Sequence, residues 1–236
     1  MRPSPSRLLP KFLLAVSLSL AGLLSVAQAQ SLPGLAEGTH YRYIADGQPY
    51  RPQPGKVEIA EVFAYGCPHC AKLAPMLEPW KRTLPKNVQL VLVPGVFGPD
   101  DAYARVFFAA EASGALPVLH PRLFAAIHET GSLARNADVT QLGSFVQGVQ
   151  GVNQAGFAAA LRNEAVLQGK LKHAYEFAGR SQIEGTPSLV VAGKYLVLGN
   201  SYQGLLDNAR KVAVALAAQA SPAAAKPATT RQAPAR

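Results

Sequence analysis

The sequence predicts an α/β fold that is interrupted by a helical subdomain. Residues 57–93 read as strand, helix and strand in succession, the pattern of a βαβ unit with a right-handed crossover. Residues 99–164 then change to short segments with helical spacing, separated by Gly, Pro and Asn. We therefore expect one α/β domain in two parts, 30–98 and 165–219, with the helical subdomain at 99–164 between them.

The βαβ unit is expected from three adjoining segments. The first strand, 57–65, is rich in β-branched and aromatic residues and is bounded by glycines. The helix begins at Pro68, a residue favoured in the first turn of a helix, and runs to about residue 84. The second strand, 88–93, reads VQLVLV and is almost wholly apolar, which is typical of a strand covered on both faces.

The second part of the domain supplies the remaining elements. A helix is expected near 165–179, followed by two short strands around the turn Ala192-Gly193. A last helix, near 202–218, opens after Ser201. Its apolar residues form a one-sided stripe of Leu205, Leu206, Ala209, Val212, Ala213 and Leu216.

The start of the chain predicts export. Arg2, Arg7 and Lys11 precede an apolar run at 12–26, which indicates a secretory signal peptide cleaved after Ala29. An uncleaved membrane anchor is the alternative, but the run of about 15 residues is shorter than the roughly 20 that a spanning helix needs. Export of this kind predicts a periplasmic protein in an oxidising compartment, where disulfides persist.

The formal charge of +9 does not indicate nucleic-acid binding. Three of these charges lie in the signal segment and three more in the tail at 220–236, which leaves +3 for the rest of the chain. The tail is rich in Ala, Pro and Thr and lacks large apolar side chains, so it is expected to be disordered.

Cys67 and Cys70 are the only cysteines of the chain, in the tetrapeptide CPHC. A structural disulfide is the simplest interpretation, but closing a four-residue loop contributes only roughly 2 kcal/mol, against about 4.7 kcal/mol for a hundred-residue loop. A metal site is the second interpretation, but structural zinc takes four ligands. Beyond the two sulfurs the chain offers only scattered histidines: His40, His69, His120, His128 and His173.

The third interpretation is a reactive pair. Where a strand turns into a helix, the first of two cysteines at i and i+3 lies at the helix N-terminus, whose unpaired N–H groups and dipole favour a thiolate. Cys67 is therefore the expected nucleophile, and Cys70 its more buried partner. A protonated His69 would stabilise the thiolate further; the alternative is an ordinary exposed residue. A lower pKa of Cys67 stabilises the dithiol and raises the two-electron potential by about 30 mV per unit, which predicts an oxidant.

The segments EVFAYGCPHCAKLAP and EGTPSLVV together resemble the thioredoxin superfamily. The CPHC tetrapeptide, the helical insertion and the signal segment resemble, within it, the DsbA family of periplasmic dithiol oxidases. The resemblance covers nearly all of residues 35–218, and it implies a thioredoxin fold with an inserted helical subdomain. Pro75 is a departure, because it matches the kink proline of thioredoxins and acidic residues common in that part of the DsbA helix are absent. The extent to which the potential is raised is therefore not predicted.

The resemblance implies roles for three residues outside the tetrapeptide. Pro187 matches the cis-proline that lies beside the catalytic sulfurs, although only about 5 to 6% of X-Pro bonds are cis in general. The backbone of Thr186 would then pair with an extended substrate peptide. Glu61, on a strand face shared with Ile59, Phe63 and Tyr65, matches an acid beneath the active site that moves protons as Cys70 titrates. The alternative for Glu61 is a solvated acid like its neighbour Glu58.

The resemblance also implies the activity, that of a dithiol oxidase with no cofactor besides its own Cys67–Cys70 disulfide. Thiolates of newly exported, reduced or unfolded proteins would attack Cys67 and expel Cys70, while Pro68 and His69 complete the catalytic tetrapeptide. A DsbB-like membrane quinone reductase would reoxidise the enzyme. We expect a monomer, since the stretch before the first strand is too short for the N-terminal dimerisation domain of family isomerases. The alternatives are a disulfide isomerase or reductase of the same fold, and a metal-binding thioredoxin-like protein.

Overall fold

The computed structural model describes residues 32–220, which form five strands and seven helices. All of the described residues belong to one unit of the chain. The predicted signal segment, 1–29, and nearly all of the predicted tail, 220–236, lie outside the described residues. Within the part that is described, no helix combines the length and the apolar character needed to cross a membrane.

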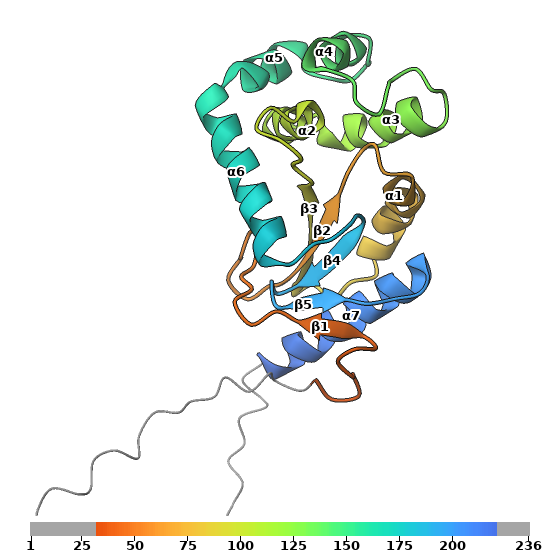
Figure 1. Cartoon of the computed structure of the whole chain (residues 1–236), viewed down its shortest axis with the longest axis vertical. Helices are drawn as coiled ribbons and strands as arrows, with labels where there is room; N and C mark the ends of the chain where they lie inside the picture. The colour runs from red at the N-terminus through yellow and green to blue at the C-terminus, as the bar shows by residue number, and fades with distance from the viewer. Residues whose placement is uncertain (1–31, 221–236) are drawn as a thin grey trace, which may run out of the picture. The chain divides into compact units, whose positions relative to one another are not determined.

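The strands form one mixed sheet in the order β1-β5-β4-β2-β3 (Figure 1). β2 and β3 run parallel and are joined through helix α1, as the βαβ pattern predicts, whereas the other neighbouring strands pair antiparallel. The α/β class is therefore confirmed. The strands are β1 (Tyr41–Tyr43), β2 (Val57–Phe63), β3 (Val88–Pro94), β4 (Ser188–Val191) and β5 (Tyr195–Val197).

Strand β1 is an element that the sequence did not predict. It has only three residues and pairs antiparallel with β5 at the edge of the sheet, with Tyr41 opposite Val197 and Tyr43 opposite Tyr195. The Tyr41 and Tyr195 rings meet edge to face at 5.1 Å between centroids. A strand this short shows no alternation of polar and apolar residues over a usable length, so only its tertiary partner reveals it.

Two helices cover one face of the sheet. Helix α1 (Pro68–Lys81) buries Cys70, Leu73, Leu77 and Trp80, a stripe at helical spacing, despite Pro75 and Pro79 within the helix. Helix α7 (Tyr202–Gln219) packs beside it into the same apolar cluster, as its predicted stripe requires. Helix α1 ends slightly before the predicted position, because Arg82 caps it and the following residues form a tight turn.

The five remaining helices share the other apolar cluster, in which α2 packs against β3 while α4 and α5 pack on α2 (Figure 1). Polar side chains fix where most of them begin: Asp101, Asp138, Asn153 and Asn163 each accept a hydrogen bond from a backbone N–H in the first turn that follows. Four helices lie in the predicted subdomain, as expected from the segment pattern. The helices are α2 (Ala102–Ala112), α3 (Leu116–His128), α4 (Val139–Gln147), α5 (Gln154–Arg162) and α6 (Glu164–Arg180).

Strand β2 ends sooner than predicted, and the positions of two side chains differ from the expected ones. Ile59 lies in the apolar cluster beneath α1 and α7, whereas Phe63 belongs to the opposite cluster and meets the Phe107 ring at 5.5 Å between centroids. The expected common face of Glu61, Ile59, Phe63 and Tyr65 is therefore wrong at Phe63 and Tyr65, and Tyr65 lies beyond the end of the strand. Phe63 is the last residue of β2 and lies opposite Pro94 of β3 at the end of the sheet.

The expectation that Glu58 is a solvated acid is also wrong. Its side chain is buried, and its two carboxylate oxygens accept hydrogen bonds at 2.6 Å from the backbone N–H groups of Tyr50 and Arg51. Burial raises the pKa of Glu58, while these N–H groups act in the opposite direction. The Arg51 side chain forms an ion pair with Glu111 on α2, at 2.7 Å. Glu58 and Glu111 together therefore hold the Pro-rich lead-in segment against β2 and α2.

Candidate active site

The first cysteine lies at the junction between strand and helix. Cys67 is the N-cap residue of α1, with extended backbone angles, and Pro68 follows in the first helical turn. No side chain caps this helix, so the sulfur of Cys67 faces unpaired backbone N–H groups. Cys67 is half-buried, Cys70 is fully buried, and both are free thiols in the structure.

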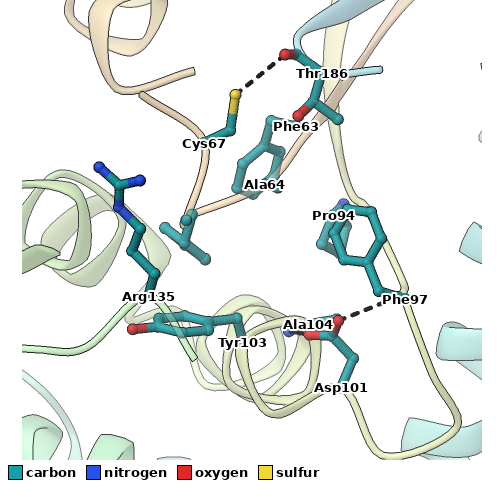
Figure 2. A pocket seen from close by; sticks show the side chains of 13 residues that line it. Phe63, Ala64, Cys67, Pro94, Phe97, Asp101, Tyr103, Ala104, Arg135 and Thr186 are labelled. Atoms are coloured by element: carbon teal, nitrogen blue, oxygen red, sulfur yellow. Dashed lines mark hydrogen bonds between the residues drawn. The ribbon is translucent and has the colours of Figure 1, made fainter. Parts of the chain in front are cut away.

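The sulfur of Cys67 lies among hydrogen-bonding groups from two segments. Its thiol donates to the carbonyl oxygen of Thr186 at 3.1 Å (Figure 2). Burial alone would raise the pKa of Cys67, but hydrogen bonds from the side chain of Thr186 and from Cys70 to the sulfur outweigh it. The backbone N–H of His69 adds to this effect, and the pKa of Cys67 lies below its ordinary value.

Cys70 has the opposite electrostatic environment. Burial raises its pKa far above that of an ordinary thiol, although the backbone N–H of Ala64 donates to its sulfur at 3.4 Å. The negative charge of Glu61 raises the pKa of Cys70 further. The two thiols of the CPHC sequence therefore differ: the pKa of Cys67 is lowered and that of Cys70 is raised.

Glu61 is buried within β2, with 1% of its surface exposed. Burial raises the pKa of its carboxyl to about 8. Its Oε2 atom has no hydrogen-bond partner among residues 32–220. The effect of its charge on the pKa values of Cys70 and Tyr65 places this carboxyl close to the buried sulfur. Glu61 is therefore a buried carboxyl with a raised pKa whose charge acts on Cys70.

The side chain of His69 turns to a residue that the sequence did not single out. Its Nδ1 atom lies 2.8 Å from the hydroxyl oxygen of Tyr202, the first residue of α7. The imidazole is exposed, and among the groups that lower the pKa of Cys67 His69 contributes its backbone N–H. The helix-start signal at Ser201 was available in the sequence, but nothing local connects Tyr202 to the CPHC segment.

The loop before β4 brings a second segment to the sulfur. The peptide bond between Thr186 and Pro187 is cis, as predicted, and the Thr186 carbonyl contacts Cys67 directly. Residues separated by more than a hundred positions in the sequence therefore meet at the reactive thiol. β4 positions this loop because it pairs antiparallel with β2, the strand that leads to Cys67.

A cavity of about 360 Å³ opens beside Cys67, between the sheet and the helical segments (Figure 2). Phe63, Pro94 and Tyr103 give it apolar walls, and Phe97, 77% exposed, lies at its edge. Arg135, from the loop between α3 and α4, also lines it and was not predicted as a site residue. Its loop position and lack of any motif left no signal in the sequence.

The predicted histidines are dispersed and individually engaged. His120 accepts or donates a hydrogen bond with the Tyr65 hydroxyl at 2.9 Å, and burial lowers its pKa to about 4. His128 and His173 each hydrogen-bond to a backbone carbonyl oxygen, at 2.7 and 2.8 Å. His40 accepts a hydrogen bond from the backbone N–H of Ala36 at 3.1 Å. In the described part of the chain, no three metal-binding side chains come together.

This chain is similar to known proteins in both sequence and fold. The family model described as "Thioredoxin" matches residues 53–207. The thiol:disulfide interchange protein DsbA of Pseudomonas syringae pv. tomato is 34% identical over 76% of this chain and 80% of its own length. The DsbA of Bordetella pertussis is 36% identical over 65% of this chain and 73% of its own length.

Solved structures agree with the sequence comparison. The crystal structure of the oxidoreductase DsbA from Xylella fastidiosa has a TM-score of 0.71 and 34% identity, covering 80% of this chain and all of that one. That of Pseudomonas aeruginosa DsbA has a TM-score of 0.66 and 31% identity, covering 80% of this chain and 96% of that one. The thioredoxin fold is therefore confirmed, and the chain belongs to the DsbA family and is a thiol:disulfide oxidase, with Cys67 and Cys70 as its CxxC pair.

Proposed function

We propose that this oxidase introduces disulfides into newly exported proteins in the periplasm by passing on the Cys67–Cys70 disulfide. The observation that carries the proposal is the contrast between the two thiols, with the pKa of Cys67 lowered and that of Cys70 raised. Stabilising the Cys67 thiolate favours the reduced enzyme, so the oxidised enzyme readily gives its disulfide away. The proposed direction of catalysis is therefore oxidation of substrate dithiols.

Each cycle consists of two thiol–disulfide exchanges. A substrate thiolate attacks the sulfur of Cys67, the bond between Cys67 and Cys70 breaks, and Cys70 leaves with the electron pair. A second substrate thiolate then attacks the substrate sulfur of the mixed disulfide and expels Cys67 as a thiolate. The substrate loses two electrons and gains a disulfide, and the enzyme gains both electrons. Because the pKa of Cys67 is lowered, Cys67 is a good leaving group in the second exchange.

Glu61 is proposed to supply the proton that Cys70 needs when it leaves. With a pKa of about 8, its carboxyl is largely protonated at neutral pH and can donate to the departing sulfur. When the enzyme is reoxidised, the carboxylate can take that proton back, because Cys70 must lose it before forming the disulfide. The buried Oε2, which has no hydrogen-bond partner in residues 32–220, supports this role.

Three residues near Cys67 are proposed to orient the substrate and to stabilise the thiolate: Pro187, Pro68 and His69. Pro187, which has no N–H group, leaves the preceding carbonyl of Thr186 beside Cys67 available to an extended peptide. Pro68 starts the helix whose N–H groups face the sulfur. His69, adjacent to Cys67, is proposed to stabilise the thiolate when its imidazole is protonated.

The oxidase acts on substrate proteins, and a partner reoxidises it. We propose that the substrates are exported proteins with reduced cysteines, and that the partner is a DsbB-like membrane quinone reductase. The predicted signal segment at 1–29 supports a periplasmic location. A monomer is proposed because the active site is assembled within a single chain.

The equilibrium with a glutathione redox buffer tests the direction of the reaction. The purified protein is incubated with increasing ratios of reduced to oxidised glutathione, and the fraction of dithiol is measured by thiol alkylation. We expect half-reduction at a far more oxidising ratio than thioredoxin requires. A potential as reducing as that of thioredoxin would instead favour the reductase alternative.

A further inference from the structure

Arg135 is held against the residue that precedes the reactive cysteine. It lies in the loop between α3 and α4, and its backbone packs against Gly66: a Cβ atom added at Gly66 would lie 3.2 Å from the carbonyl oxygen of Arg135. The Arg135 side chain lines the same cavity as Cys67 and Thr186 (Figure 2). The contact with Gly66 therefore fixes the base of a guanidinium group close to the site of disulfide exchange.

The guanidinium group of Arg135 has no partner within the described part of the chain. No hydrogen bond or ion pair engages it there, and its side chain is exposed. Arg105, in the same helical region, is by contrast paired with Glu164. An unpaired positive charge at the active-site cavity is thus available to a molecule that binds there.

The acid that shares the cavity is already engaged. The two carboxylate oxygens of Asp101 accept hydrogen bonds from the backbone N–H groups of Ala104, at 2.9 Å, and Phe97, at 3.2 Å. Asp101 also caps the N-terminus of α2, where the helix dipole compensates its charge. Its carboxylate does not reach Arg135 in an ion pair, so the cavity presents one free cation next to apolar walls.

We propose that Arg135 is a specificity-determining residue, which binds a carboxylate of the substrate while the substrate's cysteine reacts with Cys67. The occupant that fits this cavity is an extended segment of a reduced protein, with an apolar side chain against Tyr103 and Phe97 and an aspartate or glutamate near its cysteine. This inference rests on the proposed function, because it describes how that same site chooses among dithiol substrates.

The size of the effect follows from the exposure of the charge. An exposed ion pair contributes up to about 1 kcal/mol, which corresponds to about a fivefold difference in rate constant between substrates. The attraction also weakens as added salt screens it. The groups that lower the pKa of Cys67 are Thr186, Cys70 and His69, so the role of Arg135 is assigned to substrate selection rather than to the reactivity of the thiol.

Two dithiol peptides that differ in one residue test the inference. Both carry the same apolar residue, and one has glutamate and the other lysine beside the first cysteine; further pairs move this residue along the peptide. The oxidised enzyme is mixed with each peptide, and the second-order rate constant is followed by the change in tryptophan fluorescence or by alkylation. We expect wild type to prefer the glutamate peptide by about fivefold at low salt, with the preference declining as salt is added.

Variants assign the preference to one side chain. Arg135→Gln should reduce the ratio of rate constants to near unity, Arg135→Glu should reverse it, and Arg135→Lys should retain it in large part. Arg162→Gln is the matched control, because Arg162 is exposed on α5, has no partner in residues 32–220 and does not line the cavity. Its ratio should match wild type. The glutathione equilibrium of each variant checks that the redox centre is intact.

The outcomes separate this inference from the proposed function. If wild type and Arg135→Glu oxidise both peptides with the same ratio in every pair, Arg135 does not select substrates, although the oxidase function stands. If wild type oxidises neither peptide and equilibrates like a reductase, the proposed function fails and the inference fails with it. A ratio that changes equally in Arg162→Gln would show a general effect of net charge and would also overturn the inference.

Discussion

The Nδ1 atom of His69 lies 2.8 Å from the hydroxyl oxygen of Tyr202, which joins the first turn of α1 to the first residue of α7. This contact limits the positions that the imidazole can take beside Cys67. It also explains how a residue far along the sequence can influence the CPHC segment. Both side chains are therefore expected to affect the titration of Cys67.

Replacing His69 by serine should raise the pKa of Cys67 and lower the redox potential. The imidazole proposed to stabilise the thiolate is then absent, so the reduced form is less favoured, by about 30 mV for each unit by which the pKa of Cys67 rises. The thiolate absorbance of the reduced protein as a function of pH measures the first effect, and the glutathione equilibrium measures the second. An unchanged titration would reject the proposed role of His69.

Replacing Tyr202 by phenylalanine should change the Cys67 titration in the same direction as His69→Ser, but by less. The phenyl ring keeps most of the packing and removes only the hydroxyl that holds the imidazole. In the double variant the Tyr202→Phe change should add little, because both act through the same ring. Additive shifts would show that Tyr202 acts independently of His69.

Replacing Cys70 by serine should trap substrates on the enzyme. Cys67 can still form a mixed disulfide, but the internal thiol that would release it is gone. Non-reducing electrophoresis should show covalent complexes that disappear when a reductant is added. Complexes of equal yield in Cys67→Ser, which keeps only the buried thiol, would contradict the assigned roles.

The sequence was most informative where a site depends on local structure. Cys67 and Cys70 could be assigned because a strand followed by Pro68 already places a helix N-terminus there, and Pro187 because a short motif carries it. The family resemblance supplied what spacing alone did not, namely the meeting of the CPHC and Thr-Pro segments. β1 was missed because a three-residue edge strand is defined by its partner.

Long-range contacts set the limit of prediction. Tyr202 and Arg135 belong to segments that reach the active site only after the chain has folded, and neither is part of a motif. Glu58 was misjudged for a similar reason: backbone N–H groups of the lead-in segment cover it, and these leave no trace in side-chain patterns. In contrast, Glu61 was singled out, but only the structure shows that its carboxyl is fully buried.

Replacing Glu61 by glutamine should raise the free energy of unfolding relative to wild type, and this difference should grow as the pH rises. The folded pKa of about 8 lies above the ordinary value of 4.5, so between these values folding retains a proton that the unfolded chain releases. Stability of the wild type therefore falls with rising pH in this window, by up to about 1.4 kcal/mol per pH unit from this group. The variant does not titrate there.

Urea unfolding of the reduced protein across this pH range measures the difference. The gap between Glu61→Gln and wild type should grow from pH 4.5 to about 8 and then level off. Glu78→Gln, an exposed position on α1, serves as the control and should give a gap that stays nearly constant. A constant gap for Glu61→Gln would show that its carboxyl is ionised throughout and does not hold the proton proposed for Cys70.

Two reciprocal substitutions in the turn between β4 and β5 should change the free energy of unfolding in opposite directions. Ala192 and Gly193 both have positive φ, at 51° and 69°, and a Cβ atom at Gly193 would lie 2.0 Å from the carbonyl carbon of Gln48. Gly193→Ala should therefore lower the free energy of unfolding by more than about 2 kcal/mol, since strain and a backbone clash combine. Ala192→Gly should raise it by up to about 1 kcal/mol, because a left-handed residue loses its strain. Urea unfolding of both variants checks the pair, and wild-type stability in Gly193→Ala would mean that the lead-in segment is free to move away from this turn.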